Sequence, residues 1–244
     1  MNGTKVLLVT AASSDVGGSI VRKIAQNYDF VLAHYNSSLG VIEKLQEEFG
    51  KKIVPIQADF SNSDSVEKMI SKIEELDLSP DHIVHLASQR YSVQRFSKES
   101  AETFESAYKI SVLSIVKILQ AFLPKLAKQK SGKVVFMLSD VVLNMPPKYQ
   151  SCYSTTKYAL LGLMKNLAVE YADKGICVNA VSPDMIETKF LKDLPRLLVE
   201  KNAESNPLGR NLTPQDVAGA FDYLLGAGAD CVNGVNLPVT CGIA

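Results

Sequence analysis

A tyrosine and a lysine four residues apart are the side chains in this sequence best suited to proton transfer. Tyr153 and Lys157 lie in the segment Tyr-Ser-Thr-Thr-Lys, and residues four apart share one face of a helix. An ammonium close to a phenol lowers the pKa of the phenol, which would let Tyr153 pass a proton to a carbonyl group during its reduction. Since the chain holds nine tyrosines, about one such pair is expected by chance. Its position after a predicted strand is what favours the chemical interpretation.

A turn near the amino terminus has features that would hold the phosphates of a dinucleotide. Thr10–Gly17 joins a predicted strand to a predicted helix, and the free N–H groups and dipole of a helix N-terminus favour a pyrophosphate. The hydroxyls of Ser13 and Ser14 can donate hydrogen bonds to phosphate. The Asp15 carboxylate would repel it, and its alternative role is that of a solvated helix cap. The turn keeps only Gly17 and the glycine after it, so its glycine pattern is weak.

The residues after the second predicted strand bear on the choice of cofactor. An acidic residue at this position would bind the adenosine ribose 2′-hydroxyl and select NAD. The sequence has Asn36, Ser37 and Ser38 there instead. These residues can accommodate a 2′-phosphate, although no arginine stands beside them. The pattern therefore favours NADP(H) over NAD(H).

Apolar runs and helical patterns alternate along the whole chain. Strands are predicted at Lys5–Thr10, Phe30–Tyr35, Ile53–Gln57, His82–Leu86, Lys133–Ser139, Cys177–Val181 and Gly234–Val239. Helices are predicted at Gly17–Asn27, Leu39–Phe49, Ser63–Glu75, Ala101–Lys128, Tyr153–Lys174 and Pro214–Leu225, with Ser63 and Thr213 as caps. This order predicts a single α/β domain over residues 1–244, a Rossmann-type doubly wound parallel sheet of about seven strands. Ligands of such sheets bind beyond the carboxyl ends of the strands.

The composition argues against several classes of protein. The 244 residues are 46% hydrophobic and 21% charged, with 26 basic and 26 acidic residues. This balance gives no field that would attract nucleic acid or an anionic membrane, so neither is an expected partner. The four cysteines and three histidines have no zinc-ligand spacing. We therefore expect a cytoplasmic protein with reduced cysteines and no metal.

The order of these motifs resembles that of the short-chain dehydrogenase/reductase family over essentially the whole chain. The resemblance rests on Thr10–Gly17, on Asp59 after the third strand, on a serine closing the fifth strand, on Tyr153-x-x-x-Lys157 and on Gly175–Pro183. Pro207–Arg210 and Pro214–Ala218 are similar to the 3-oxoacyl-carrier-protein reductase branch. The resemblance implies an oxidoreductase that acts on a CH–OH/C=O pair with NAD(P).

The family's functional residues map onto defined positions of this chain. The resemblance implies that Tyr153 is the proton donor, that Lys157 tunes it and holds the nicotinamide ribose, and that a serine orients the carbonyl. Asp140 has the usual spacing from Tyr153, but one inserted residue in the 141–150 loop would give this role to Ser139, which we prefer because loops absorb insertions readily. Ser111 takes the place of the helix asparagine that supports a proton relay. Cofactor contacts are implied for Ser13, Ser14, Val16, Asn36, Asp59, Phe60, Ala87, Lys157, Pro183, Ile186 and Thr188.

Several departures from the family pattern accompany these matches. Ala11 and Asp15 replace the first two glycines of the turn, His85-Leu86-Ala87-Ser88 replaces Asn-Asn-Ala-Gly, and Asp184 replaces the glycine after Pro183. The first two changes are expected to weaken pyrophosphate binding by about 1 kcal/mol each. They leave open an alternative, a catalytically weakened or inactive homologue that acts as a partner subunit or a nucleotide-binding sensor.

The expected function is NADP(H)-dependent reduction of a 3-oxoacyl thioester on an acyl carrier protein or a polyketide-type analogue, in fatty acid or polyketide biosynthesis. A small-molecule substrate such as a sugar or an alcohol is the alternative. Residues 185–212 are interpreted as a substrate lid or a plain surface excursion. Lys128, Lys130 and Lys174 suggest a docking site for an acidic carrier. The apolar faces of the two longest helices predict a homodimer or homotetramer.

Overall fold

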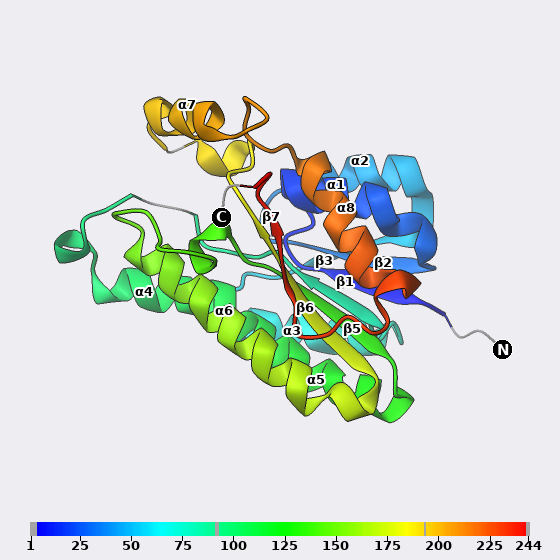
Figure 1. The fold of residues 1–244 in the computed structure, drawn as a ribbon. Helices are drawn as coiled ribbons and strands as arrows, with labels where there is room; N and C mark the ends of the chain where they lie inside the picture. The colour runs from blue at the N-terminus through cyan, green and yellow to red at the C-terminus, as the bar shows by residue number, and fades with distance from the viewer. Residues whose placement is uncertain (1–3, 91–92, 193, 243–244) are drawn as a thin grey trace.

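The computed structural model describes residues 4–90, 93–192 and 194–242. Within them, parallel strands form one sheet in the order β3-β2-β1-β4-β5-β6-β7 (Figure 1). The strands are β1 (Val6–Val9), β2 (Phe30–Tyr35), β3 (Ile53–Gln57), β4 (His82–His85), β5 (Gly132–Met137), β6 (Ile176–Pro183) and β7 (Asn236–Val239). All seven predicted strands are confirmed, each within two residues at either end.

Helices cover both faces of this sheet (Figure 1). One face carries α1 (Asp15–Ile24), α2 (Gly40–Phe49) and α8 (Pro214–Leu225), and the other carries α3 (Ser63–Glu75), α4 (Ala101–Tyr108), α5 (Ser114–Gln129) and α6 (Ser151–Glu170). The side chains of β1 alternate between the two cores, because Leu8 packs with the α5 and α6 side while Leu7 and Val9 pack with the α1 and α8 side. This burial on both faces explains why the strands are continuous apolar runs in the sequence.

The direction of strand order reverses at β1, which pairs with β2 on one side and with β4 on the other. Such a reversal opens a crevice beyond the carboxyl ends of the strands. The turn after β1 is fastened there by backbone hydrogen bonds from Thr10 N to Val84 O (2.9 Å) and from Ala12 N to His34 O (2.8 Å). The turn therefore lies at the crevice, as predicted.

The predicted helix at Ala101–Lys128 is divided in the structure. A π-helical turn at Lys109–Leu113 separates α4 from α5, and Ser111 lies at its centre. The helical stretch Ala101–Gln129 is long and apolar enough by composition to cross a membrane, but half of its most apolar window is buried inside the protein. That burial is typical of a helix that packs on a sheet.

Helix ends were predicted with mixed success. Thr213 caps α8 in a full capping box with Asp216, as expected. The assignment of Ser63 as a cap was wrong, because the side chain of Asn62 accepts the free N–H groups of α3 and Ser63 is the first helical residue. A further helix, α7 (Arg196–Ser205), lies within residues 185–212 at the edge where the strands end (Figure 1).

Candidate active site

Tyr153 and Lys157 lie in the first two turns of α6, beside the carboxyl end of β5. The Lys157 side chain is buried, with 2% of its surface exposed, and its Nζ donates to the carbonyl oxygen of Met137, the last residue of β5, at 2.9 Å. The same nitrogen lies 5.4 Å from the centroid of the Tyr153 ring. The predicted shared face is confirmed by this contact.

Burial dominates the titration of both side chains. It lowers the pKa of Lys157 to about 8 and raises that of Tyr153 to about 12, where a hydrogen bond with Ser139 acts in the opposite direction and the charge of Asp140 in the same one. The expected lowering of the phenol pKa is therefore wrong for the protein without cofactor. The reason is geometric, since the ammonium lies over the ring and the phenol has lost its water. A phenol that stays protonated at pH 7 is suited to donate a proton.

Ser139 lies closer to the phenol than the sequence spacing indicated. Its hydroxyl donates to Asp140 Oδ1 at 2.7 Å, and a hydrogen bond also links it to Tyr153. Burial raises the pKa of Asp140, and the nearby Asp184 carboxylate adds to this effect. Ser139 and Asp140 both line the cavity described next, and the Ser139 hydroxyl contacts both the phenol and the Asp140 carboxylate.

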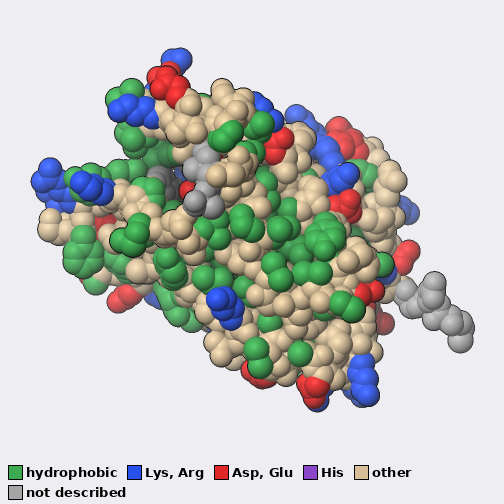
Figure 2. All heavy atoms as spheres, in the orientation of Figure 1, with side chains coloured by type: hydrophobic (Ala, Val, Ile, Leu, Met, Phe, Trp, Pro, Cys, Tyr) green, Lys and Arg blue, Asp and Glu red, His purple; other side chains and the backbone are tan. Residues whose placement is uncertain are grey.

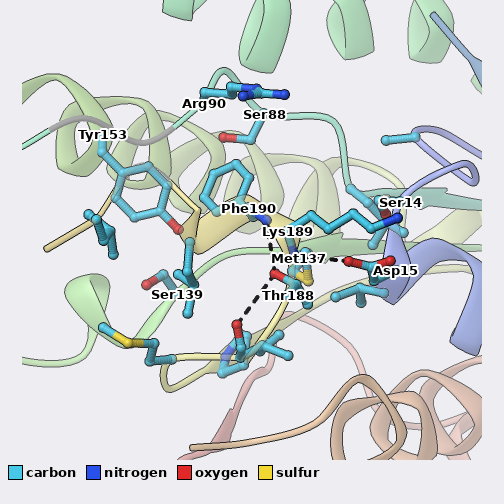
Figure 3. A pocket seen from close by; sticks show the side chains of 18 of the residues that line it. Ser14, Asp15, Ser88, Arg90, Met137, Ser139, Tyr153, Thr188, Lys189 and Phe190 are labelled. Carbon is cyan, nitrogen blue, oxygen red and sulfur yellow. Dashed lines mark hydrogen bonds between the residues drawn. The ribbon is translucent and has the colours of Figure 1, made fainter. Parts of the chain in front are cut away.

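One large cavity, of about 680 Å³, runs along the carboxyl ends of the strands (Figure 3). Among the predicted site residues, its wall includes Ser13, Ser14, Val16, Ser139, Tyr153, Lys157, Pro183, Ile186 and Thr188. It also includes the polar residues Ser38, Lys44, Arg90, Asn202 and Lys189. Ser38 belongs to the polar run after β2, and Asn202 and Lys189 belong to the 185–212 segment interpreted as a lid, whereas Lys44 and Arg90 left no signal in the sequence.

Five predicted site residues are not among the described residues that line this cavity. Asp59 binds the backbone N–H and hydroxyl of Ser61, Phe60 stacks on His34, and Ala87 is buried in the core. The remaining two are Asn36, whose carbonyl oxygen accepts from Gln57, and Ser111.

Ser111 lies behind Tyr153 instead. It is 1% exposed, its carbonyl oxygen faces His85 Nε2 at 2.9 Å, and its hydroxyl accepts from the N–H of Gln89 at 3.3 Å. It lines a second cavity of about 20 Å³ together with Tyr153 and Gln89, and the buried Gln89 Oε1 atom has no hydrogen-bond partner among the residues that the structure describes. A space of this size holds one water molecule.

The turn after β1 is built without the first two of the family's glycines. Ala11 has φ of 50°, a left-handed conformation that costs about 1 kcal/mol for a residue with a Cβ, and its N–H donates to Nδ1 of the buried His34 at 2.8 Å. Gly17 is indispensable, because a Cβ there would lie 2.4 Å from the carbonyl oxygen of Ala11. The turn thus keeps its close approach to α1.

Asp15 is not the cap of α1. Ser14 fills that position, its Oγ accepting from Gly17 N at 2.9 Å. The Asp15 carboxylate reaches across the cavity and accepts the backbone N–H of Lys189 at 3.0 Å. The cap interpretation of Asp15 is therefore wrong, and its carboxylate connects the cofactor turn to the 185–212 segment.

Comparison with known proteins identifies the family. A family model described as "Enoyl-(Acyl carrier protein) reductase" matches residues 10–244. The chain belongs to the short-chain dehydrogenase/reductase family. The 3-oxoacyl-[acyl-carrier-protein] reductase FabG of Aquifex aeolicus is 30% identical over 98% of this chain and 97% of its own length. FabG of Staphylococcus aureus is 30% identical over 100% and 99%, and the uncharacterized oxidoreductase YmfI of Bacillus subtilis is 30% identical over 98% of both chains.

Solved structures agree on the fold of this short-chain dehydrogenase/reductase. A protein from Agrobacterium tumefaciens assigned as a gluconate dehydrogenase superposes with a TM-score of 0.89 at 19% identity, over 99% of this chain and 96% of the other. The structure of gox2181 gives a TM-score of 0.88 at 24% identity, over 98% and 95%. Family membership makes the chain an NAD(P)-dependent oxidoreductase.

The cavity fits such a cofactor on two observations. The buried ammonium of Lys157 borders it and, within the described ranges, forms no ion pair, so hydroxyl groups of a ribose would complete its hydrogen bonds. The close packing of Gly17 against Ala11 also leaves the start of α1 accessible from the cavity. Lys157 would hold the nicotinamide ribose, and the residues at the start of α1 would meet the phosphates.

Proposed function

We propose that this protein is an NADP(H)-dependent carbonyl reductase whose substrate is a 3-oxoacyl thioester on a carrier protein. The single observation that carries the chemistry is the cluster at the cavity wall. There the protonated phenol of Tyr153 is hydrogen-bonded to Ser139 and lies beside the buried ammonium of Lys157. A proton donor, a hydroxyl to orient the carbonyl and a buried cation are what carbonyl reduction requires of the protein.

Each side chain has a defined task in this reaction. The bound nicotinamide supplies the hydride. Tyr153 donates its proton to the developing alkoxide, and Ser139 orients the carbonyl oxygen toward the phenol. Lys157 would hold the nicotinamide ribose and places its ammonium beside the Tyr153 ring. The small cavity shared by Ser111 and Tyr153 has room for a water molecule through which the phenol can be reprotonated.

The adenosine end of the cavity supports the preference for NADP(H). Ser38 and Lys44 line it, and the start of α2 lies against α1, because a Cβ on Gly18 would come within 2.7 Å of Val41 Cγ1. Lys44 therefore brings a positive charge, which also acts on Glu48, to the cavity wall that Ser38 of the polar run after β2 lines. A 2′-phosphate would gain a cation there.

The substrate end of the cavity supports an acyl chain. Its wall includes the apolar residues Leu138, Val141, Pro147, Met185, Phe190, Leu191 and Leu194, and the FabG relatives are named as acting on acyl-carrier-protein substrates. An apolar wall beside a few polar groups suits a long aliphatic substituent better than a sugar.

The proposed docking site for an acidic carrier, at Lys128, Lys130 and Lys174, requires a second copy of the chain. Lys130 and Lys174 precede β5 and β6, so they lie at the amino ends of the strands, opposite the cavity. They can serve a cavity mouth only if it belongs to a second copy of the chain.

Figure 2 shows hydrophobic side chains over the middle of the face and charged ones mainly around its edge. Val169 on α6 is 81% exposed and Tyr158 45%, which supports the proposal of a homodimer or homotetramer.

The test is NADPH consumption with 3-oxoacyl thioesters of a carrier protein and of coenzyme A. We expect turnover by the wild-type protein and loss of at least about a hundredfold in Tyr153→Phe, as is usual for a general acid. Tyr158→Phe, on an exposed tyrosine of the same helix, is the matched control and should keep its activity. Nucleotide binding without turnover of any thioester would refute the proposal and favour the sensor alternative.

A further inference from the structure

A hydrogen bond connects the cofactor turn with the 185–212 segment. The backbone N–H of Lys189 donates to Asp15 Oδ2 at 3.0 Å, between residues 174 positions apart. Both residues line the large cavity. Figure 3 shows the Lys189 side chain extending across the cavity toward Ser14, the cap of α1. A cation and an anion thus face the point where the family places the cofactor phosphates.

Basic side chains are scarce at this point. The described turn from Thr10 to Gly18 contains none, and Arg22 on α1 is occupied by a double hydrogen bond to Glu48 at 2.8 Å. Lys157 lies at the other end of the cavity, under Tyr153. Lys44 and Arg90 also line the cavity, but Figure 3 shows Lys189 extending toward Ser14 and Arg90 lying beside Ser88. A diphosphate at the start of α1 would therefore meet the helix dipole and the Lys189 ammonium first.

We propose that Lys189 is a diphosphate-binding residue of this protein and that Asp15 holds its place when no cofactor is bound. The Asp15 carboxylate now occupies the backbone N–H of Lys189, as a phosphate oxygen would. An arriving diphosphate takes over that N–H, meets the Lys189 ammonium and displaces the carboxylate. This inference rests on the proposed function only in so far as the cavity binds a dinucleotide.

The two residues should act in opposite directions on binding. Loss of the Lys189 ammonium removes attraction, whereas loss of the Asp15 charge removes repulsion and weakens the hydrogen bond that occupies the N–H. A separate contact holds the 185–212 segment when the hydrogen bond between Asp15 and Lys189 is broken. Asn202 and Asn206 donate their side-chain N–H groups to the Asp184 carboxylate at the end of β6, at 3.1–3.3 Å.

Calorimetric titration of the full chain with ADP-ribose and with NADPH tests the proposal, with AMP as the probe that lacks a diphosphate. We expect Lys189→Ala to bind ADP-ribose about tenfold more weakly, the range of one charge-assisted hydrogen bond, with a smaller effect on AMP. Lys192→Ala is the matched control, because Lys192 is exposed on the same segment and lies outside the cavity wall. It should leave both affinities unchanged. Asp15→Asn keeps the size of the side chain and should strengthen ADP-ribose binding.

The outcomes separate this inference from the proposed function. If wild-type protein binds neither ADP-ribose nor NADPH, both are refuted. If it binds them and Lys189→Ala has the affinity of Lys192→Ala, or Asp15→Asn weakens binding, the role of Lys189 and Asp15 is refuted while the reductase proposal stands. Raising the ionic strength provides a further readout, since it should weaken ADP-ribose binding less in Lys189→Ala than in the wild type.

Discussion

Replacement of Lys157 by methionine is expected to stabilise the cofactor-free protein while abolishing its activity. Lys157 is 2% exposed, and within the described part of the chain the hydrogen-bond partner of its ammonium is one carbonyl oxygen, that of Met137. Burial of a charge with so little compensation opposes folding. Methionine keeps the length of the side chain without the charge. The unfavourable free energy of burying the charge should therefore disappear, and so should the function of the residue.

The magnitude follows from the pKa of Lys157. A folded-state value of about 8 against 10.5 for an ordinary lysine corresponds to about 3 kcal/mol of destabilisation below pH 8. Methionine leaves the Met137 carbonyl oxygen without its donor, which costs about 1–2 kcal/mol. The net gain in free energy of unfolding at pH 7 is then about 1–2 kcal/mol, or about 2–8 °C in Tm for a chain of this size.

The pH dependence distinguishes this cause from a gain in packing. Between pH 8 and 10.5 the folded wild type releases a proton that the unfolded chain keeps, so wild-type stability rises through this window relative to the variant. Urea unfolding at pH 7, 9 and 10.5 should therefore show the advantage of Lys157→Met shrinking. Lys165→Met, on an exposed lysine of the same helix, is the control. A pH-independent difference, or a less stable Lys157→Met at pH 7, would contradict the reasoning.

Two other perturbations have definite expected outcomes. The Asp140 carboxylate accepts a hydrogen bond from the Ser139 hydroxyl, and burial raises the pKa of Asp140. Protonation of Asp140 at low pH should therefore free the Ser139 hydroxyl for the substrate, so kcat/KM for reduction should rise as pH falls through that pKa. Asp140→Asn should flatten this part of the pH profile. Gly17→Ala would place a Cβ 2.4 Å from backbone and should lower the free energy of unfolding by about 1–3 kcal/mol, with weaker NADPH binding. Gly219→Ala, where a Cβ meets nothing within 4 Å, should stabilise α8 by about 0.5–1 kcal/mol; equal unfolding midpoints for the two variants would refute the steric argument.

The fold could be predicted because each element leaves a local pattern in the sequence. β2, β3, α3 and α8 have the predicted bounds, since buried parallel strands are apolar runs and α3 and α8 are amphipathic. The π-helical turn at Lys109–Leu113 could not be predicted in this way. The sequence of this turn continues the apolar pattern of the predicted helix, so the pattern gives no sign that the helix is divided.

The site could be predicted only where one motif defines it. Tyr153 and Lys157 come from one helix, so their spacing together with their position after the fifth strand was sufficient. The pKa of the phenol was predicted in the wrong direction, because burial of Tyr153 depends on what packs over it. Lys44 and Lys189 reach the cavity from segments whose placement is a tertiary property. No local signal distinguishes them from the many solvated lysines of the chain.

The departures from the family pattern acquire a common meaning in the structure. Asp15 and Asp184 stand at two positions where the family has glycine, and each carboxylate binds the 185–212 segment, one through Lys189 and the other through Asn202 and Asn206. A glycine has no side chain with which to make either contact. A site that decays after loss of function accumulates charges without partners, whereas both of these carboxylates have partners in the same segment. Their pairing shows that both replacements are accommodated by contacts with the 185–212 segment.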